Sequence, residues 1–290
     1  MTRSKAGKQH QAKQATGRRH KRRSTRRGLP RYGWLLIVLA VVGVIILVRA
    51  YPPGQTPPHN SGTPRAAIVD QLSVLRENAP FIEEVTSQLE QLGLEVDLYQ
   101  GEEITVDFYR KLPTHGYRVI VFRTHSGILE EGEQVHEKTT IFTNEEFDWK
   151  KHQADVWHDR LFRAGIDDDR PRVFSIGPKF IRDGMQGRFD DTVIIMMGCA
   201  GIYLPDLAEA FIANGASAYI AWDASVLLDY VDGATEHLVK QLCSEKATVG
   251  EAVVSTMAAR GPDPRYEAEL QYYPQGIGGK TLADLTRFHA

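Results

Sequence analysis

The chain has 290 residues, and its 35 Lys/Arg nearly balance its 37 Asp/Glu. The balance is not uniform, because residues 1–31 hold twelve Lys/Arg and no acidic residue. Residues 65–290 carry 22 Lys/Arg and all 37 Asp/Glu, a net charge of about −15. This asymmetry excludes one uniform domain and predicts a basic arm followed by an acidic domain.

Residues 1–31 show no apolar periodicity, which is typical of a disordered and solvated segment. A basic arm of this kind could bind nucleic acid. It could also act as a topology signal that contacts anionic lipid head groups. We expect the second role and no nucleic-acid partner.

Residues 32–48 carry no charge, and Arg49 closes this run of 17 residues, which is at the lower limit for spanning a bilayer. Aromatic residues lie at both ends of the run, as in membrane-interface anchors: Tyr32, Trp34 and Tyr51. We therefore expect one transmembrane helix within residues 32–51. Since Lys/Arg beside a membrane helix stay in the cytoplasm, the following domain should be extracytoplasmic on a single-pass cell-membrane protein.

Cleavage of the anchor is an open alternative. Val48-Arg49-Ala50 loosely fits a signal-peptidase site, and Thr25-Arg26-Arg27 loosely fits a twin-arginine signal. The long basic segment and the long apolar run favour an uncleaved anchor.

Residues 52–64 contain five prolines and predict a semi-extended linker. The stretch 65–290 is long enough for one well-buried domain. Strand and helix patterns alternate along it, which indicates an α/β fold with a mostly parallel sheet. The expected strands cover residues 65–69, 94–99, 117–124, 193–197 and 218–222, and the expected helices cover residues 80–92, 105–112, 204–214, 229–243 and 249–259.

Residues 127–191 break this rhythm. They contain turns and two short strand-like runs, at 139–143 and 172–175. A long insertion after a strand end is a common place for a lid or a substrate pocket.

Two apolar runs end abruptly at chemically reactive residues. The run from Val119 leads to His125, and the run from Val193 leads to Cys199. Each reactive residue is followed within two positions by Gly. Because sites of open α/β sheets lie at the carboxyl ends of the strands, the imidazole and the thiol should be neighbours. This pair is the minimum for a cysteine nucleophile with a histidine base.

Three segments together resemble the caspase–haemoglobinase-fold cysteine peptidases, a group that includes caspase-like, gingipain-like and CHAT-like domains. They are Thr124-His125-Ser126-Gly127, Met197-Gly198-Cys199-Ala200-Gly201, and the helix–Gly–strand pattern 208–222 that ends in Trp222. The resemblance covers roughly residues 66–260. It implies a caspase-like αβα sandwich, with the His after the third strand and the Cys after the fourth.

The resemblance also implies roles for individual residues. His125 would be general base and acid, Cys199 the nucleophile, and the N–H groups of Gly127 and Cys199 the oxyanion donors. In the family the Gly directly follows the His, whereas here Ser126 intervenes, so Ser126 or Gly127 could donate. Asp223, after Trp222, would border the pocket for the residue before the scissile bond and suit Lys or Arg there. A turn or helix-cap acid is the alternative for Asp223.

No cofactor and no metal are expected. His152 and His158 are six residues apart with no Cys pair nearby, which is not a metal-binding spacing. Cys243 lies on a helical pattern and should be a packing residue. A Cys199–Cys243 disulfide would be possible outside the cytoplasm and would abolish nucleophilic chemistry.

The sequence thus predicts a membrane-anchored extracytoplasmic cysteine endopeptidase that acts on polypeptides. The main alternative is a non-catalytic caspase-like ectodomain that binds or assembles partners at the cell envelope. A third is a transferase on the same dyad, such as a sortase-like ligase. Cleavage specificity, zymogen activation and oligomeric state stay open.

Overall fold

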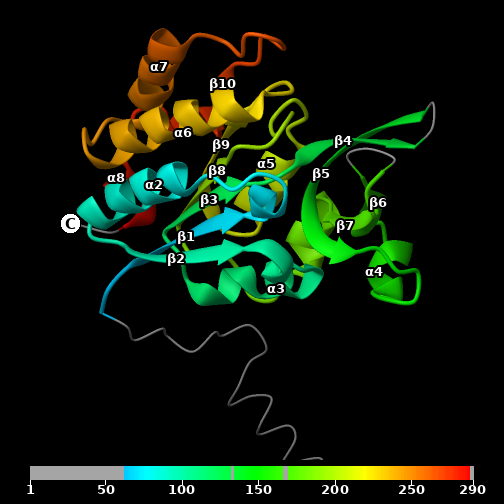
Figure 1. The fold of residues 1–290 in the computed structure, drawn as a ribbon. Coiled ribbons are helices and arrows are strands. Elements are labelled where there is room, and N and C mark those ends of the chain that lie inside the picture. Colours follow the sequence, from blue (N-terminus) through cyan, green and yellow to red (C-terminus); the bar gives the residue numbers. More distant parts are fainter. Residues whose placement is uncertain (1–61, 132–133, 166–168, 288–290) are drawn as a thin grey trace, which may run out of the picture. The chain divides into compact units, whose positions relative to one another are not determined.

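A computed structural model describes residues 62–131, 134–165 and 169–287 (Figure 1). The expected basic arm 1–31, the expected transmembrane helix 32–51 and the linker up to residue 61 lie outside this part. Within it, no helix combines the length and the apolar character that membrane crossing needs.

The domain is a mixed α/β fold built on a mostly parallel sheet, as the alternating pattern predicts. Sheet A has six strands in the order β10-β9-β8-β3-β1-β2, and only the edge strand β10 is antiparallel to its neighbour. The strands are β1 (Arg65–Asp70), β2 (Glu95–Gln100), β3 (Val119–Arg123), β8 (Thr192–Met196), β9 (Ala216–Trp222) and β10 (Leu270–Tyr273).

The two central strands, β3 and β8, are buried at every residue, which explains their continuous β-branched sequences. They are adjacent and parallel, with Val119 opposite Val193 and Phe122 opposite Met196. The prediction that strand 117–124 neighbours strand 192–197 in parallel is confirmed.

Helices cover both faces of sheet A (Figure 1). On one face lie α2 (Ala79–Gln91), α6 (Leu228–Cys243), α7 (Val249–Arg260) and α8 (Leu282–Thr286). On the other lie α3 (Val106–Lys111) and α5 (Asp206–Ala213). Short 3-10 and π turns connect them: η1 (Gln71–Val74), η2 (Gly101–Glu103), η3 (Leu112–His115), η4 (Phe180–Gly184) and η5 (Gln275–Ile277).

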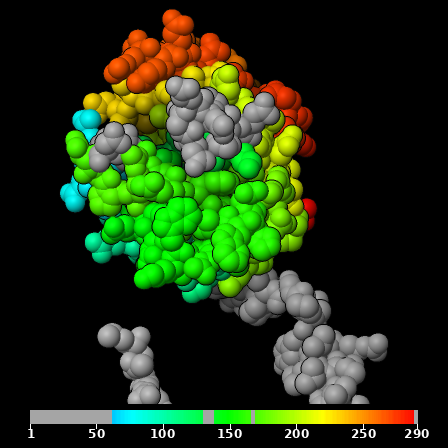
Figure 2. All heavy atoms as spheres, turned by 90° about the vertical axis from the view of Figure 1, so that its right-hand side faces the viewer, coloured from blue at the N-terminus to red at the C-terminus, as the bar shows by residue number. Residues whose placement is uncertain are grey.

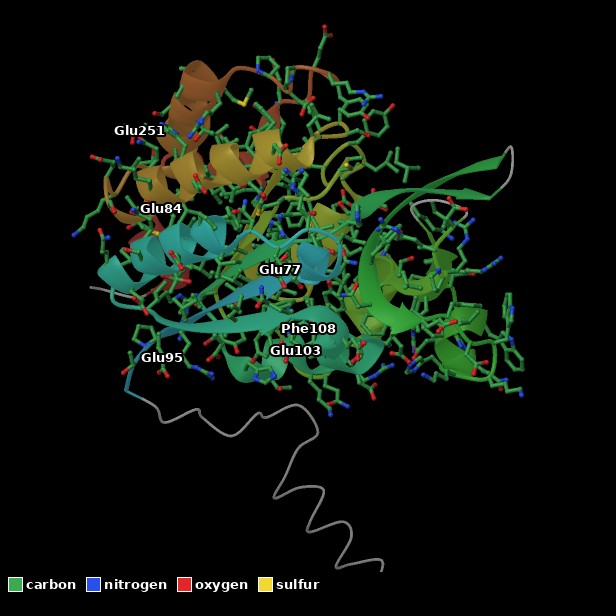
Figure 3. All side chains as sticks on the ribbon, in the orientation of Figure 1. Glu77, Glu84, Glu95, Glu103, Phe108 and Glu251 are labelled. Carbon is green, nitrogen blue, oxygen red and sulfur yellow. The ribbon has the colours of Figure 1, made fainter. Side chains whose placement is uncertain are left out.

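Each face of sheet A has its own apolar core. The core under α2, α6 and α7 includes Val121 and Ile195, whereas Ile120 and Ile194 point into the core under α3 and α5. This division follows from the alternation of side chains along a strand. Glutamates such as Glu84 and Glu251 remain at the exposed surfaces of their helices (Figure 3).

The insertion after β3 forms a second sheet. Sheet B has four strands in the order β4-β5-β7-β6, all antiparallel: β4 (Ser126–Glu131), β5 (Gln134–Glu146), β6 (Leu161–Ala164) and β7 (Val173–Ile176). The short helix α4 (Gln153–Trp157) precedes β6. The sequence patterns indicate β5 and β7, but not β4 and β6. Figure 2 looks onto the face of the domain that this insertion occupies, in green.

Candidate active site

His125 and Cys199 follow adjacent strands at the same edge of sheet A. His125 lies three residues beyond Phe122, and Cys199 lies three residues beyond its register partner Met196. The two segments are joined directly, because the Ser126 hydroxyl donates a hydrogen bond to the Cys199 carbonyl oxygen at 2.8 Å. The structure therefore brings the two predicted residues to one edge.

The backbone of His125 is held from both sides. Its N–H donates to the Gln71 side-chain oxygen at 2.9 Å, and its carbonyl accepts from the Phe142 N–H at 2.9 Å. Gln71 belongs to η1, directly after β1, and is almost fully buried. These contacts fix the position of the imidazole relative to β1 and β5.

The His125 ring lies in an apolar environment. Its centroid is 5.8 Å from that of Phe142, and its Nε2 is buried with no hydrogen-bond partner among the described residues. Burial, and secondarily the positive charge of Arg170, lowers the pKa of His125 from 6.5 to about 4. The imidazole is therefore neutral at pH 7, and the lowered pKa makes it a weaker proton acceptor than an exposed imidazole.

Cys199 lies on a tight turn that leaves its thiol partly exposed. The Val226 N–H points to its Sγ at 3.4 Å, and the Val226 carbonyl lies 3.8 Å from it. These two contacts orient the thiol toward the backbone of Val226. The next residue, Ala200, has φ of +51°, a left-handed conformation that is strained for a residue with a Cβ.

Gly198 is required by the close approach of the two strand ends. A Cβ at this position would lie 2.1 Å from the Ser126 Oγ and 2.7 Å from the Thr124 carbonyl oxygen. At Gly127, in contrast, an added Cβ would meet no atom within 4 Å. The Gly before the Cys is thus a packing requirement of the site.

No hydrogen bond joins the His125 ring to the Cys199 Sγ within residues 62–131, 134–165 and 169–287. The thiol is turned to Val226 instead. Catalytic hydrogen bonds are often long or unformed before substrate binds. Reaction at this site therefore requires the thiol and the imidazole to approach each other.

The strand ladder decides which N–H groups face the site. His125 accepts from Phe142, so His125 and Phe142 form the hydrogen-bonded type of antiparallel pair. The alternation makes Gly127 and Thr140 the next such pair, which turns the Gly127 N–H toward β5. The Ser126 N–H then points away from β5, while the Cys199 N–H has no hydrogen-bond partner in the described part of the chain.

Trp222 and Asp223 lie at the end of β9, as expected from the sequence. Trp222 is 1 % exposed and packs edge-on against Tyr230, so it offers no surface to a ligand in this conformation. The Asp223 carboxylate accepts the Glu269 N–H at 2.8 Å. This contact ties the Asp223 carboxylate to the backbone of the residue immediately before β10.

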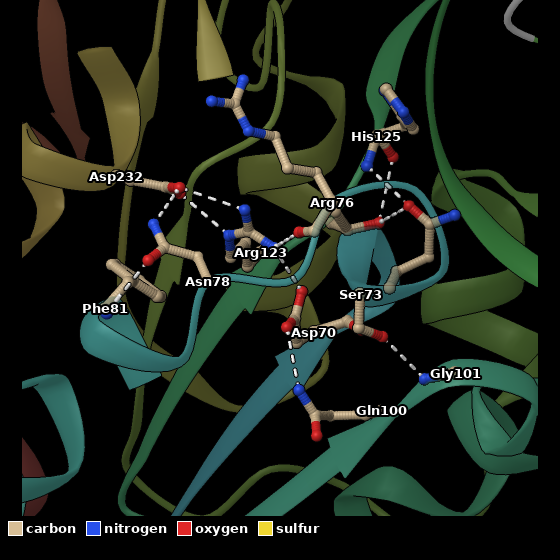
Figure 4. A network of polar contacts seen from close by, with 12 residues as sticks. Asp70, Ser73, Arg76, Asn78, Phe81, Gln100, Gly101, Arg123, His125 and Asp232 are labelled. Carbon is tan, nitrogen blue, oxygen red and sulfur yellow. Dashed lines mark hydrogen bonds and ion pairs between the residues drawn. The ribbon is translucent and has the colours of Figure 1, made fainter. Parts of the chain in front are cut away.

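A buried ion network that the sequence analysis missed is centred on Arg123, two residues before His125 (Figure 4). The Arg123 guanidinium donates to both oxygens of Asp232 at 2.9 and 3.0 Å and to Asp70 at 2.8 Å. Its remaining bond goes to the Arg76 carbonyl at 3.0 Å. Arg123 and Asp70 are fully buried, so this network fixes the ends of β1 and β3 against α6.

A signal for this network is present in the sequence. Arg123 interrupts an apolar strand run, and a cation at a buried position needs an acidic partner. Asp70 ends the first strand in a similar way. Asp232 could not be found by this reasoning, because it is distant in sequence and lies on a helix with other acidic residues.

Both cysteines are free in the structure. Cys243 is 3 % exposed within the core, and burial raises the pKa of its thiol to about 12. It is a packing residue, as expected from its helical position. Among the described residues, no group of three or more His, Cys, Asp or Glu side chains is placed to hold a metal ion.

No protein-family model matches the chain, and no curated protein matches it.

Proposed function

We propose that the chain is a caspase-like cysteine endopeptidase that acts on polypeptides by acyl transfer. The observation that carries this proposal is the meeting of His125 and Cys199 at the carboxyl ends of two adjacent parallel strands. His125 follows the third strand of sheet A along the chain and Cys199 follows the fourth, which is the order that the resemblance implies.

Each residue of the proposed site has a defined role in acyl transfer. The Cys199 sulfur attacks the scissile carbonyl carbon after His125 has taken the thiol proton. The N–H groups of Cys199 and Ser126 stabilise the oxyanion, with Ser126 taking the place first expected for Gly127. His125 then gives the proton to the departing amine, and water hydrolyses the thioester.

A thiol-directed peptidyl electrophile tests this proposal. It should label wild-type protein at Cys199 and should not label Cys199→Ala. Cys243→Ala is the matched control and should label like wild type, because Cys243 is buried and its pKa is raised. Peptide cleavage that survives Cys199→Ala would refute the proposal.

The missing bond between His125 and Cys199 favours a second candidate, a non-catalytic ectodomain that binds partners at the cell envelope. Under this alternative, folded protein would neither react with the electrophile nor cleave any peptide in a library. Limited proteolysis within residues 128–190 should precede the assay, so that a latent zymogen is activated first.

We further propose that residues 32–51 anchor the enzyme in the cell membrane with the catalytic domain outside. The support is the charge asymmetry around the apolar run. Protease added to intact cells should degrade the chain beyond the linker and spare the basic arm, and a fully protected domain would contradict this topology.

A further inference from the structure

We propose that a pocket beside His125 binds a large apolar side chain of the polypeptide on the leaving-group side of the scissile bond. This inference rests on the proposed peptidase function. It adds a specificity-determining site that the catalytic pair alone does not define.

The pocket lies in the insertion and has a volume of about 600 Å³. Its walls are rich in aromatic and aliphatic side chains from β5, β6 and the segment before α4, including Phe142, Phe147, Trp149 and Phe162. Trp149 is 68 % exposed and stands edge-on against Phe147 at 4.8 Å. The aromatic part of this lining favours an apolar occupant, and the charged residues Asp159, Arg163 and Arg172 complete the wall.

The pairing of β4 with β5 is irregular beside the pocket. Ile128 faces Thr139 and Glu130 faces Val135, so the register shifts here and the extra residues lie on β5. Neighbouring residues of a regular strand point to opposite faces, yet Ile128 and Leu129 both line the pocket. Two consecutive apolar residues of β4 thus contribute to one pocket where the pairing is irregular.

The pocket begins next to the imidazole. Phe142 lines it, and the Phe142 ring centroid is 5.8 Å from that of His125. No lining residue comes from the segment that carries Cys199. The pocket is therefore on the histidine side of the catalytic pair.

The position relative to His125 assigns the direction of the substrate. The imidazole must reach the nitrogen that departs, because it donates the proton to that nitrogen. The peptide segment carrying the new amine consequently leaves past His125. A side chain of that segment is the one placed to enter the pocket.

The edge of sheet B offers main-chain contacts to the same segment. β4 is an edge strand that starts immediately after His125. By the alternation of its ladder, Ile128 turns its N–H group away from β5, two residues beyond the Ser126 N–H that serves the oxyanion. An extended peptide can pair with such an edge and place alternate side chains in a neighbouring pocket.

Charges near the pocket disfavour a basic occupant. Lys138 lies over the Phe162 ring at 5.5 Å, and the exposed Arg163 is part of the lining. The lining acid Asp159 is paired with Lys179 at 3.1 Å. We therefore expect Phe or Leu to be preferred over Gly and over Lys.

Acyl transfer to an added amine tests the pocket alone, because the acyl half of the substrate is the same in every reaction and only the amine varies. An acyl-enzyme is formed from one peptide ester, and amino acid amides compete with water for it. The amine nitrogen bonds to the acyl carbon, the bond to the Cys199 sulfur breaks, and the proton lost by the amine passes through His125 to the sulfur. The ratio of transfer to hydrolysis then reports binding on the leaving-group side.

Wild-type enzyme should use phenylalaninamide or leucinamide about tenfold more efficiently than glycinamide, the preference expected from burying one large apolar side chain. Trp149→Ala should lower this preference at least about threefold. Trp157→Ala is the matched control, because Trp157 is 79 % exposed and does not line the pocket.

The outcomes separate the two proposals. The pocket assignment is overturned if wild-type enzyme uses phenylalaninamide and glycinamide equally well, or if Trp149→Ala and Trp157→Ala show equal preferences. The peptidase function stands in either case as long as the acyl-enzyme is hydrolysed. If folded enzyme forms no acyl-enzyme, the peptidase function itself is refuted and the pocket assignment falls with it.

Discussion

The neutral, buried imidazole of His125 is the least usual feature of the site at the level of single residues. Its Nε2 has no partner in the described part of the chain, and burial lowers its pKa to about 4. A base of this kind is unprotonated over the whole neutral range. It also links the site to the stability of the fold.

This link predicts a pH-dependent loss of stability. In the unfolded chain the histidine titrates near 6.5, so between pH 6.5 and 4 the unfolded state binds a proton that the folded state does not. The stabilisation is complete above pH 6.5 and is lost as the pH falls to 4, by up to about 3 kcal/mol. His125→Gln cannot be protonated, so it should lose less stability over this window than wild type. Urea unfolding at pH 7 and pH 4.5 measures this difference, and equal losses would contradict the prediction.

At the level of elements, the site depends on how closely the ends of β3 and β8 approach. Ser126 bonds to the Cys199 carbonyl, and only a Gly fits at position 198 between the two segments. The strand that starts at Ser126 carries the proposed oxyanion donor and borders the proposed pocket.

Gly198→Ala should therefore damage the site more than the fold. The added Cβ meets both a side chain and the Thr124 backbone oxygen, so the strand ends must separate. A shift of about 1 Å in a catalytic group can cost on the order of 100-fold in rate. Gly127→Ala is the control, since a Cβ there meets nothing within 4 Å. Comparable kcat/KM values for the two variants would show that the approach of the strands does not matter.

The main elements of sheet A could be predicted from the sequence, because buried strands and amphipathic helices leave strong local patterns. The expected helix 229–243 corresponds to α6, and the expected strand 218–222 lies within β9. β10 was not predicted, since it is a short edge strand without a continuous apolar run. β4 was missed because Gly127 and acidic residues obscure its alternation, and its pairing with β5 is a contact that no local pattern shows.

The candidate site, too, could be predicted from the sequence only in part. The positions of His125 and Cys199 at one sheet edge follow from two local runs and the geometry of parallel strands. The contacts of Gln71, Val226 and Asp232 with the site segments could not be predicted, because each joins segments distant in sequence. The orientation of the Gly127 N–H likewise depends on the ladder of sheet B.

At the level of the whole molecule, the Arg123 network joins the first and last parts of the described domain. Arg123 on β3 bonds to Asp70 on β1 and to Asp232 on α6, 109 residues further along the chain. Asn78, which caps α2, also donates to Asp232 at 2.7 Å. One cation lies between two buried carboxylates, and the side-chain amides of Asn78 and Gln100 donate further hydrogen bonds to the carboxylate oxygens.

This arrangement predicts that the same Asp→Asn substitution at two positions of α6, three residues apart, lowers the free energy of unfolding by different amounts. Asp232→Asn removes a carboxylate that holds two guanidinium nitrogens in the interior; Asp70 still pairs with Arg123, so the cost is that of lost hydrogen bonds to a charged group, about 1.5–3 kcal/mol. Asp229→Asn breaks a pair with Arg76 whose side chains are 72 % and 57 % exposed, and such pairs contribute at most about 1 kcal/mol. The free energy of unfolding in urea at pH 7 compares the two variants. An equal loss in both, or a larger loss in Asp229→Asn, would contradict the prediction. Because Asp232 also holds Arg123 immediately before the catalytic segment, Asp232→Asn should lower kcat/KM even where the protein is fully folded, whereas Asp229→Asn should leave it unchanged.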